Sequence, residues 1–442
     1  MVLVKSSQVT AESLRVSSVI KAALQAQLID DENPSGLFYD LTLFRKQCKE
    51  LITAFPPSAL HGFAIKANPV VAMVREARKL GMGAECASIA EVHIALEAGV
   101  HPSRIIYDSP AKTRTELVFA LSRGIYVNAD NLQEVERIAA LRERHERCRK
   151  GLVGVRINPQ TGAGKIKETS TASASSKFGV PLKEQRGALV QAFKHYKWLC
   201  GVHVHVGSQG CGADQLIEGA RVAYELAEQL NAERDNQVTN IDIGGGLSAN
   251  YDSDEVGMTF AEYACELRER VPGLFTGKYR ILTEFGRRIN AKVGWFAAQV
   301  EYTKHAGGRN IVLCHAGAHM FQRPVYLPEK WYHRIEVYDA QGNPKAKCFP
   351  QDEWIPQDIG GPLCFSGDLL AVGRVLPRVE QGDWIVVRDS GAYTLSMFSR
   401  HTSQLVPGVY GYEESYPSEL SQLKRPETPF DVVDMYHDGE PR

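Results

Sequence analysis

Residues 105–142 have the sequence IIYDSPAKTRTELVFALSRGIYVNADNLQEVERIAALR, and this stretch decides the fold class. Two short segments in it, 105–107 and 125–127, are rich in the β-branched and aromatic residues of buried strands. Each is followed by a segment with helical spacing of apolar residues, 113–122 and 132–142. This alternation predicts right-handed crossovers between parallel strands.

The same alternation continues on both sides of this stretch. Further strands are predicted at 62–65, 154–157, 199–206, 240–243 and 279–284, and further helices at 43–55, 71–80, 90–98, 182–195, 215–230 and 259–270. About eight strand–helix units in about 250 residues are typical of a closed (β/α)₈ barrel rather than an open sheet. We therefore expect an α/β barrel domain over residues 41–292.

After residue 290 the pattern changes to strands separated by turns rich in Gly, Pro and Asp. Strand-like segments occur at 295–303, 310–314, 334–337, 369–372 and 384–388. We expect residues 293–442, together with residues 1–40, to form an all-β second domain. Residues 161–176 consist mainly of Gly, Ser, Thr and Ala and are expected to form a flexible loop, which is the candidate lid over the site.

The composition argues for a small-molecule substrate. The chain has 442 residues, with 51 basic and 52 acidic side chains, so no positive surplus favours a nucleic acid or a membrane. No apolar run is long enough to span a bilayer. The nine dispersed cysteines form no C-x-x-C pair, which argues against disulfides and a metal site and favours the cytoplasm. A transit peptide within the Ser-rich residues 1–25 is the alternative.

Lys66 ends a predicted strand, in the segment FAIKANP at residues 63–69. A lysine at the C-terminal end of a barrel strand points to the face where these barrels carry their active sites. Desolvation there makes an amine nucleophilic. The alternative is a surface lysine with no chemical role.

Two further segments suit a phosphorylated ring. Gly244, Gly245 and Gly246 follow a strand, and glycines let backbone N–H groups approach an anion closely. His203 and His205 alternate on a strand and share one face, so that His205 could lie against a flat ring while Ser208 reaches a phosphate. A buried histidine pair of structural function is equally compatible.

Glu284 and Arg287 lie in the segment TEFGRR, residues 283–288, at the end of the last barrel strand. A carboxylate there can pair with a protonated pyridine nitrogen, and an arginine can hold a phosphate or a carboxylate. A structural salt bridge is the alternative. In the second domain, Cys364 lies in the segment GPLCFSGD, residues 361–368, and either has a chemical role or simply fills the core.

Taken together, these motifs resemble the fold-type III pyridoxal-phosphate decarboxylases, the group of diaminopimelate, ornithine and arginine decarboxylases. The resemblance extends from about residue 36 to residue 412. The runs HVHVGSQ (203–209), CFSGD (364–368) and GAY (391–393) are most similar to diaminopimelate decarboxylases. The resemblance implies a barrel plus a C-terminal β domain, and a head-to-tail homodimer in which the β domain contributes to the partner's active site.

The resemblance also implies a role for each site residue. Lys66 would form the Schiff base with pyridoxal 5′-phosphate, and Glu284 would keep the pyridine nitrogen protonated. His205 would stack on the ring, and Ser208, Gly245 and Gly246 would hold the phosphate. Tyr393 would contact cofactor and substrate, and Arg287 and Arg323 would hold a distal carboxylate. Cys364 of the partner would manage protonation, and Lys177 and Asp368 would bridge the subunits.

The sequence departs from the family pattern at two positions. Phe285 replaces the usual proline of the glutamate motif, which puts little in doubt. Phe365 replaces the glutamate that binds the distal ammonium in diaminopimelate decarboxylases. Because phenylalanine cannot pair with an ammonium, we expect a substrate with a distal carboxylate or acyl group and no distal amine, as in secondary metabolism or siderophore synthesis.

Three alternatives remain at this point. The first is decarboxylation of meso-diaminopimelate in lysine biosynthesis. The second is an amino-acid racemase that shares cofactor and barrel, although Glu284 argues against it because racemases of this type present an arginine to the ring nitrogen. The third is a decarboxylase-like regulator without activity, against which the presence of Lys66, His205, Glu284, Cys364 and Tyr393 argues.

Overall fold

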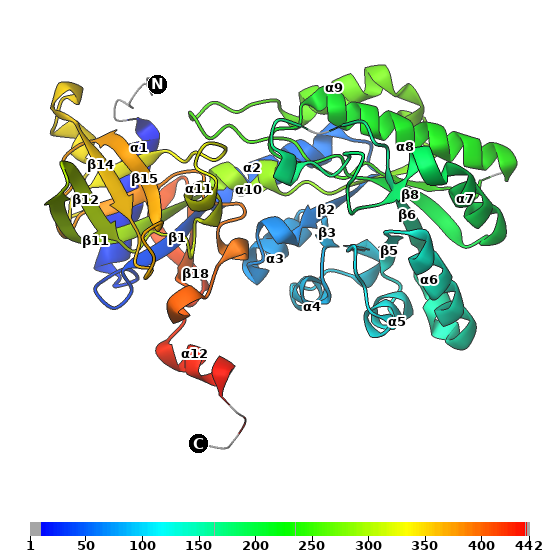
Figure 1. Cartoon of the computed structure of the whole chain (residues 1–442), viewed down its shortest axis with the longest axis horizontal. Coiled ribbons are helices and arrows are strands. Elements are labelled where there is room, and N and C mark those ends of the chain that lie inside the picture. The colour runs from blue at the N-terminus through cyan, green and yellow to red at the C-terminus, as the bar shows by residue number, and fades with distance from the viewer. Residues whose placement is uncertain (1–9, 163, 235, 438, 440–442) are drawn as a thin grey trace. The chain divides into compact units, whose positions relative to one another are not determined.

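A computed structural model describes residues 10–162, 164–234, 236–437 and 439. The chain divides into two compact units (Figure 1). The first, here called the barrel unit, comprises Arg45–Asn250 and Glu255–Ile289. The second, called the β unit, comprises the described residues up to Phe44, Tyr251–Asp254 and the described residues from Asn290 onward.

Eight parallel strands form a closed ring in the described part of the barrel unit. In ring order they are β2 (Leu60–Ala64), β3 (Gly83–Cys86), β4 (Ile105–Asp108), β5 (Tyr126–Ala129), β6 (Val153–Asn158), β8 (Leu199–Val204), β9 (Asn240–Asp242) and β10 (Arg280–Thr283), which pairs again with β2. The short β7 (Val180–Pro181) adds to β6. The predicted (β/α)₈ barrel is thus confirmed.

Helices lie outside these strands in Figure 1. They are α2 (Leu41–Ala54), α3 (Val71–Lys79), α4 (Ile89–Glu97), α5 (Arg114–Ser122), α6 (Leu132–Arg144), α7 (Leu182–His195), α8 (Ala213–Glu233) and α9 (Phe260–Arg270). Side chains fix several of their starts: Thr113 and Thr259 form capping boxes with Glu116 and Glu262. The helix boundaries therefore follow from local sequence as well as from packing.

The interior of the barrel has an apolar end and a polar end. Leu60, Ile106, Tyr126 and Leu282 form an apolar cluster inside the barrel. Toward the C-terminal ends, buried charged side chains replace the apolar ones: Glu85, Asp108, Arg156, His203, Asp242 and Glu284. Burying so many ionisable groups is costly unless they pair, so this end of the barrel is built for chemistry rather than for stability.

The β unit contains a nine-stranded mixed sheet. Its strands are β1 (Ser35–Asp40), β11 (Gly294–Ala306), β12 (Arg309–Cys314), β13 (Ile335–Tyr338), β14 (Ile355–Gly360), β15 (Leu369–Leu376), β16 (Trp384–Val387), β17 (Gly408–Glu413) and β18 (Tyr416–Lys424). The predicted all-β domain is confirmed. The strands β1, β14, β17 and β18 were not predicted from the sequence. In β18, for example, exposed positions do not alternate regularly with buried ones, so the pattern typical of a strand is absent.

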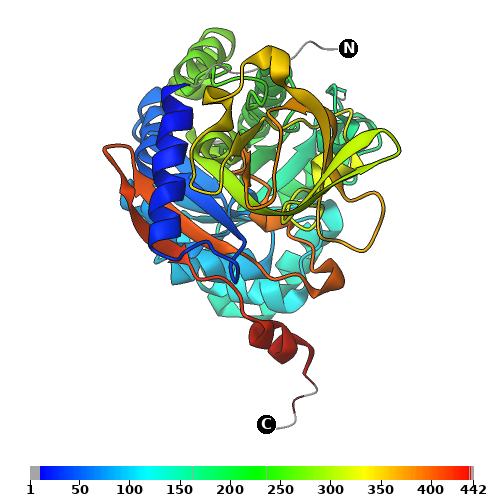
Figure 2. The ribbon, with the colours of Figure 1, turned by 90° about the vertical axis from the view of Figure 1, so that its left-hand side faces the viewer.

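Two helices at the ends of the described chain also belong to the β unit. Helix α1 (Ala11–Gln25) packs beside β18 (Figure 2) and buries Val16, Val19 and Ile20 in the same core as Trp295 and Trp384. Helix α12 (Pro429–Tyr436) follows the last strand. No helix among the described residues is both long and apolar enough to cross a membrane.

Candidate active site

Lys66 lies in a 3₁₀ turn, Ile65–Ala67, that directly follows β2. The prediction that Lys66 ends the strand is therefore slightly wrong. The turn forms because the Asn68 N–H donates to the Ile65 carbonyl, and Pro69 after it has no N–H with which to extend strand pairing. The Lys66 Nζ lies 2.5 Å from the Glu85 Oε2.

Glu85 is the first site residue that sequence analysis missed. It lies in β3, one strand away from β2, and its register partner is Ala64. Its side chain has no exposed area. Burial raises the pKa of Glu85 to about 8, and the nearby charge of Glu284 adds to this, whereas Lys66 opposes it. The feature that could have indicated Glu85 is a charged residue within a short segment that is otherwise apolar or small, Gly83–Cys86.

The glycine loop is shaped by its surroundings. Gly246 has φ +114°, a backbone conformation that favours glycine. A Cβ at Gly245 would collide with the Glu284 carbonyl, and one at Gly246 with the Gly207 carbonyl. The Gly245 N–H donates to Nδ1 of His205 at 3.1 Å. The loop thus requires small residues and lies against the histidine.

His205, Ser208 and Arg287 lie around this loop. The Arg287 Nε donates to the Ser208 Oγ at 3.2 Å, so two of the predicted anion-binding side chains are in contact. Burial, together with the charge of Lys66, lowers the pKa of His205 to about 3. His205 therefore presents a neutral ring at neutral pH, which is suited to stacking on an aromatic ligand.

Glu284 follows β10, and its N–H donates to the Gly244 carbonyl at 2.8 Å. Its carboxylate is buried, and Oε2 lies 3.5 Å from Nε2 of His203. Nδ1 of His203 lies 3.7 Å from Oδ1 of Asp108, whose Oδ2 accepts a 2.9 Å bond from Arg156. The structure thus separates the two histidines: His203 is in the barrel interior, whereas His205 follows the end of β8.

Asp108, His203 and Glu284 place potential ligand atoms within 4.8 Å of one another. Arg156 already pairs with Asp108, and a guanidinium beside a carboxylate disfavours a cation there. We therefore interpret these residues as a charge network rather than a metal centre.

The β unit holds Arg323 and Tyr393 together. The Arg323 guanidinium lies 4.6 Å from the Trp331 ring centroid and 4.7 Å from that of Tyr393, so two aromatic rings fix its position. Trp331 was missed in the sequence, since an isolated tryptophan has no motif. The arrangement suits an arginine that must present a fixed charge to an anionic ligand.

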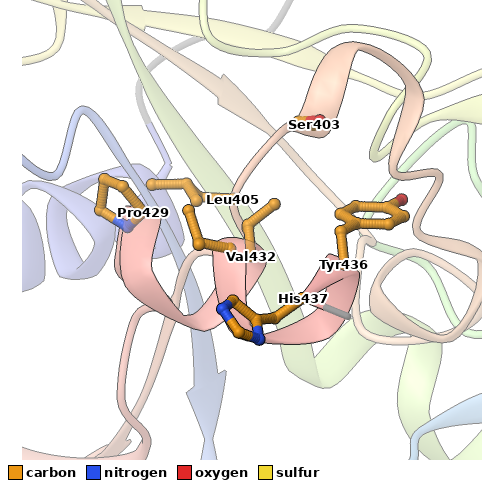
Figure 3. Close-up of a pocket in the computed structure, with 7 residues that line it drawn as sticks. Ser403, Leu405, Pro429, Val432, Tyr436 and His437 are labelled. Atoms are coloured by element: carbon orange, nitrogen blue, oxygen red, sulfur yellow. The ribbon is translucent and has the colours of Figure 1, made fainter. Parts of the chain in front are cut away.

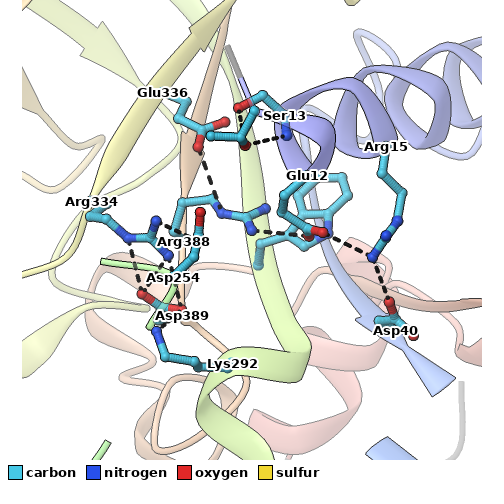
Figure 4. Close-up of polar contacts among 12 residues, drawn as sticks. Glu12, Ser13, Arg15, Asp40, Asp254, Lys292, Arg334, Glu336, Arg388 and Asp389 are labelled. Carbon is cyan, nitrogen blue, oxygen red and sulfur yellow. Dashed lines mark hydrogen bonds and ion pairs between the residues drawn. The ribbon is translucent and has the colours of Figure 1, made fainter. Parts of the chain in front are cut away.

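The turn that carries Tyr393 is held by ion pairs (Figure 4). Asp389 has a positive φ of 57° and is buried, and its carboxylate lies 3.1 Å from Arg334 and 3.4 Å from Lys292. Tyr393 has the same φ of 57°. Because positive φ is unfavourable for both residues, these contacts are what fix the turn.

Cys364 and Phe365 lie in the loop between β14 and β15. Cys364 is exposed, so it does not fill the core. The Phe365 ring stacks on Tyr326 with 5.9 Å between centroids. Asp368 is buried and accepts bonds from the N–H groups of Ala318 (2.6 Å) and Leu363 (2.8 Å), so it organises its own loop.

Lys177 is exposed, with its Nζ 4.9 Å from the Phe178 ring. The predicted residues thus form two groups, one in each unit. Lys66, His205, Ser208, Gly245, Gly246, Glu284 and Arg287 belong to the barrel unit, as does Lys177; Arg323, Cys364, Phe365, Asp368 and Tyr393 belong to the β unit.

Residues 161–176 differ from the expected flexible loop where they are described. The Thr171 N–H donates to the Val206 carbonyl at 2.9 Å, and the Ser208 N–H donates to the Thr169 carbonyl at 3.0 Å. The Thr169 hydroxyl donates to the Gln209 carbonyl at 2.6 Å. The hydroxyl-rich composition therefore serves to bind this loop along the segment that carries His205 and Ser208.

A hollow of about 740 Å³ lies elsewhere, between α12 and the segment before it (Figure 3). Its lining is mainly apolar and includes Leu405, Pro429, Val432 and Tyr436. It contains none of the residues predicted to carry chemistry. The candidate active site is therefore the polar end of the barrel.

The barrel group fits pyridoxal phosphate. It combines an amine at Lys66, a glycine loop that a Cβ would fill, an arginine–serine pair beside it, and the buried carboxylate of Glu284, whose Oε1 accepts no hydrogen bond from any residue that the structure describes. These features define the class of (β/α)₈ barrel enzymes that use this cofactor.

Comparisons with known proteins identify the family. Residues 41–291 match the family described as pyridoxal-dependent decarboxylase, pyridoxal binding domain. Diaminopimelate decarboxylase of Helicobacter pylori is 30% identical over 344 residues, covering 77% of this chain and 81% of the relative. That of Aquifex aeolicus is 29% identical over 368 residues, covering 82% and 83%.

Solved structures agree. The crystal structure of the Helicobacter pylori diaminopimelate decarboxylase complexed with L-lysine superimposes with a TM-score of 0.82 at 27% identity, covering 94% of this chain and 99% of that one. The chain belongs to the pyridoxal-dependent decarboxylases. It is an amino-acid decarboxylase that uses pyridoxal 5′-phosphate.

Proposed function

We propose that this enzyme removes one carboxylate of meso-diaminopimelate, and that the barrel residues hold the cofactor as the sequence predicts. The observation that carries the substrate proposal is Arg323, which is fixed between Trp331 and Tyr393 as a receptor for a carboxylate remote from the reacting carbon. The names of the relatives from Helicobacter pylori and Aquifex aeolicus support the same substrate.

Each barrel residue has a defined task in this proposal. Lys66 would hold the cofactor through its side-chain amine and would give up that position to the amine of the substrate. The Gly246 N–H and the close approach that Gly245 permits, with Ser208 and Arg287, would hold the phosphate. Glu284 would hold a proton at the ring nitrogen, and the neutral His205 would pack against the ring. The bound cofactor supplies a sink for the electron pair left when carbon dioxide departs.

We further propose that Cys364 returns a proton to the substrate carbon in the active site of a partner subunit. Its exposure on the β unit supports this, because a thiol that serves another chain must be accessible. The proposal requires a homodimer, with Lys177 and Asp368 at the interface and Tyr393 in contact with cofactor and substrate. Asp368 would act there by shaping the loop that carries Cys364.

The corresponding domain boundaries are residues 41–292 for the cofactor-binding barrel, and residues 1–40 with 293–442 for the β domain. The matched family region, 41–291, supports the first of these. We place the reaction in the cytoplasm, a proposal supported by the nine cysteines, all free.

A second candidate substrate is favoured by Phe365. Its ring stacks on Tyr326 and lies edge-on to His401, with centroids 6.5 Å apart, so this position presents an aromatic surface and no anion. Such a surface suits an amino acid with a distal carboxylate or acyl group and no distal amine, the kind of substrate found in secondary metabolism.

Carbon-dioxide release from purified holoenzyme distinguishes the two substrates. It should be measured with meso-diaminopimelate and with 2-aminopimelate, which has the distal carboxylate but no distal amine. Our proposal predicts a higher kcat/KM for meso-diaminopimelate. A preference for 2-aminopimelate that Phe365→Glu reverses would establish the second candidate instead.

A further inference from the structure

His203 lies in the barrel interior and has no exposed side-chain area. Each of its ring nitrogens faces a carboxylate: Nε2 lies 3.5 Å from Glu284 and Nδ1 lies 3.7 Å from Asp108. A neutral imidazole carries one N–H and can serve only one of two carboxylates, whereas an imidazolium carries two. The geometry therefore favours the charged form.

The charges around His203 come from four other strands of the barrel or from the residue just after one of them. Asp108 is on β4, Arg156 is the register partner of His203 on β6, Asp242 is its partner on β9, and Glu284 follows β10. Arg156 bonds to Asp108, and Lys66 lies 2.5 Å from Glu85. His203 lies within ion-pair distance of Glu284, with 3.5 Å between Nε2 and Oε2.

The carboxyl groups in this end of the barrel differ in their protonation. Burial and the charge of Glu284 raise the pKa of Asp242 to about 8. Glu284 is equally buried, and burial alone would raise its pKa, yet its pKa is lowered because His203 and, after it, Lys66 together oppose burial. Burial alone would lower the pKa of His203, but the carboxylates of Glu284 and Asp108 together raise it to about 9.

We propose that His203 is a positioning residue: as an imidazolium braced by Asp108 and Arg156, it keeps the Glu284 carboxylate ionised and aimed at the cofactor's ring nitrogen. The inference rests on the proposed role of Glu284. Without the imidazolium, the buried Glu284 would take up a proton and could no longer hold a protonated ring nitrogen.

His61 provides a matched control within the same barrel. It is also buried, and its Nδ1 lies 2.9 Å from the Thr283 hydroxyl. Burial and the charge of Arg104 lower the pKa of His61 to about 4, so it is neutral. Replacing it removes a buried histidine of equal size without removing a charge from Glu284.

The test uses apoenzyme and 4′-deoxypyridoxine 5′-phosphate, which keeps the pyridine nitrogen and the phosphate but cannot bond to Lys66. Its Kd is measured by protein fluorescence at pH 6.5 to 9.5 for wild type, His203→Gln, Glu284→Gln, the double variant and His61→Gln. Thermal unfolding of each apoenzyme shows which variants are folded.

We expect His203→Gln to weaken binding about tenfold at pH 7, and to add almost nothing in the Glu284→Gln background, since residues that act as a unit are not additive. The difference from wild type should close above about pH 9, where His203 loses its own charge. His61→Gln should bind like wild type.

Additive effects of the two substitutions, a pH-independent difference, or equal weakening by His61→Gln would overturn the inference. If His203→Gln does not fold, the pH dependence of Kd in the wild type provides the test. The affinity of the wild type for the analogue must then fall as pH rises through about 9. If Glu284→Gln binds the analogue as tightly as wild type, the proposed role of Glu284 is wrong, and the inference about His203 is wrong as well. Loss with Glu284→Gln but not with His203→Gln overturns this inference alone.

Discussion

The Lys66 ammonium lies 2.5 Å from the carboxylate of Glu85, a side chain that is fully buried in the neighbouring strand. An anion at this distance favours the charged form of the amine, which is not nucleophilic. Cofactor attachment therefore requires that the pair first lose a proton. Because the pKa of Glu85 is raised to about 8, the protonation state of the pair changes close to neutral pH.

Glu85→Gln should accelerate attachment of pyridoxal phosphate to the apoenzyme by about tenfold at pH 9, where Glu85 is ionised because the pH exceeds its pKa of about 8, since the amine then loses the anion that keeps it charged. Stopped-flow absorbance measures the rate. Glu134→Gln is the control, since Glu134 makes a similar buried pair with Lys112, 3.1 Å apart, elsewhere in the barrel. An unchanged rate in Glu85→Gln would show that the pair does not govern attachment.

Lys66→Ala should bind the cofactor without a covalent bond and lose the associated absorbance band, because no other amine is proposed to carry it. Decarboxylation should fall by at least ~10³-fold. The exposed Lys79, which pairs with Glu76, serves as control through Lys79→Ala. Retention of the band in Lys66→Ala would reassign the covalent site.

Arg323→Gln should raise KM for a substrate with a distal carboxylate about 10- to 100-fold, the value of a lost charge-assisted hydrogen bond. Arg323→Lys should also bind weakly, since lysine lacks the planar fork that stacks between Trp331 and Tyr393. Arg374→Lys tests a matched arginine that lies 4.3 Å from the Tyr332 ring. Equal KM values for all variants would exclude Arg323 from substrate binding.

The apoenzyme should become less stable as pH rises from 6.5 to 9. Folding raises the pKa of His203 to about 9 and those of Glu85 and Asp242 to about 8, so the folded state binds more protons than the unfolded state in this range. Each such proton contributes a slope of about 1.4 kcal/mol per pH unit. Urea unfolding at several pH values measures this slope.

His203→Gln should make the slope shallower between pH 7 and 9, because one of the three groups is gone. Glu284, with its lowered pKa, stabilises the fold above its unfolded pKa and does not change within this window. Stability that rises with pH in wild type would show that the buried network is not protonated as described.

Much of the fold could be predicted from sequence because strand–helix alternation is local. The predicted strands and helices of the barrel recur in the structure with ends shifted by a few residues. Helix α1 was not predicted, because its apolar face is interrupted by serines, of which Ser17 bonds to the Gly342 carbonyl far along the chain. A contact of that range leaves no local pattern.

The candidate site, like the fold, could be predicted only in part from the sequence. Lys66, Glu284 and the glycine loop each follow a strand closely and could be placed on one face of the barrel from sequence. Glu85, and the braced position of His203 between Glu284 and Asp108, depend on which strands are neighbours and on how deep each side chain lies. Those relations exist only once the barrel has closed.

The most direct test of the central claim is a product analysis with meso-diaminopimelate and holoenzyme. We expect one carbon dioxide and one lysine for each substrate consumed, with loss of both products in Lys66→Ala. Inversion of the substrate's α-carbon without carbon dioxide would contradict it, as would the absence of carbon dioxide from every amino acid with a distal carboxylate.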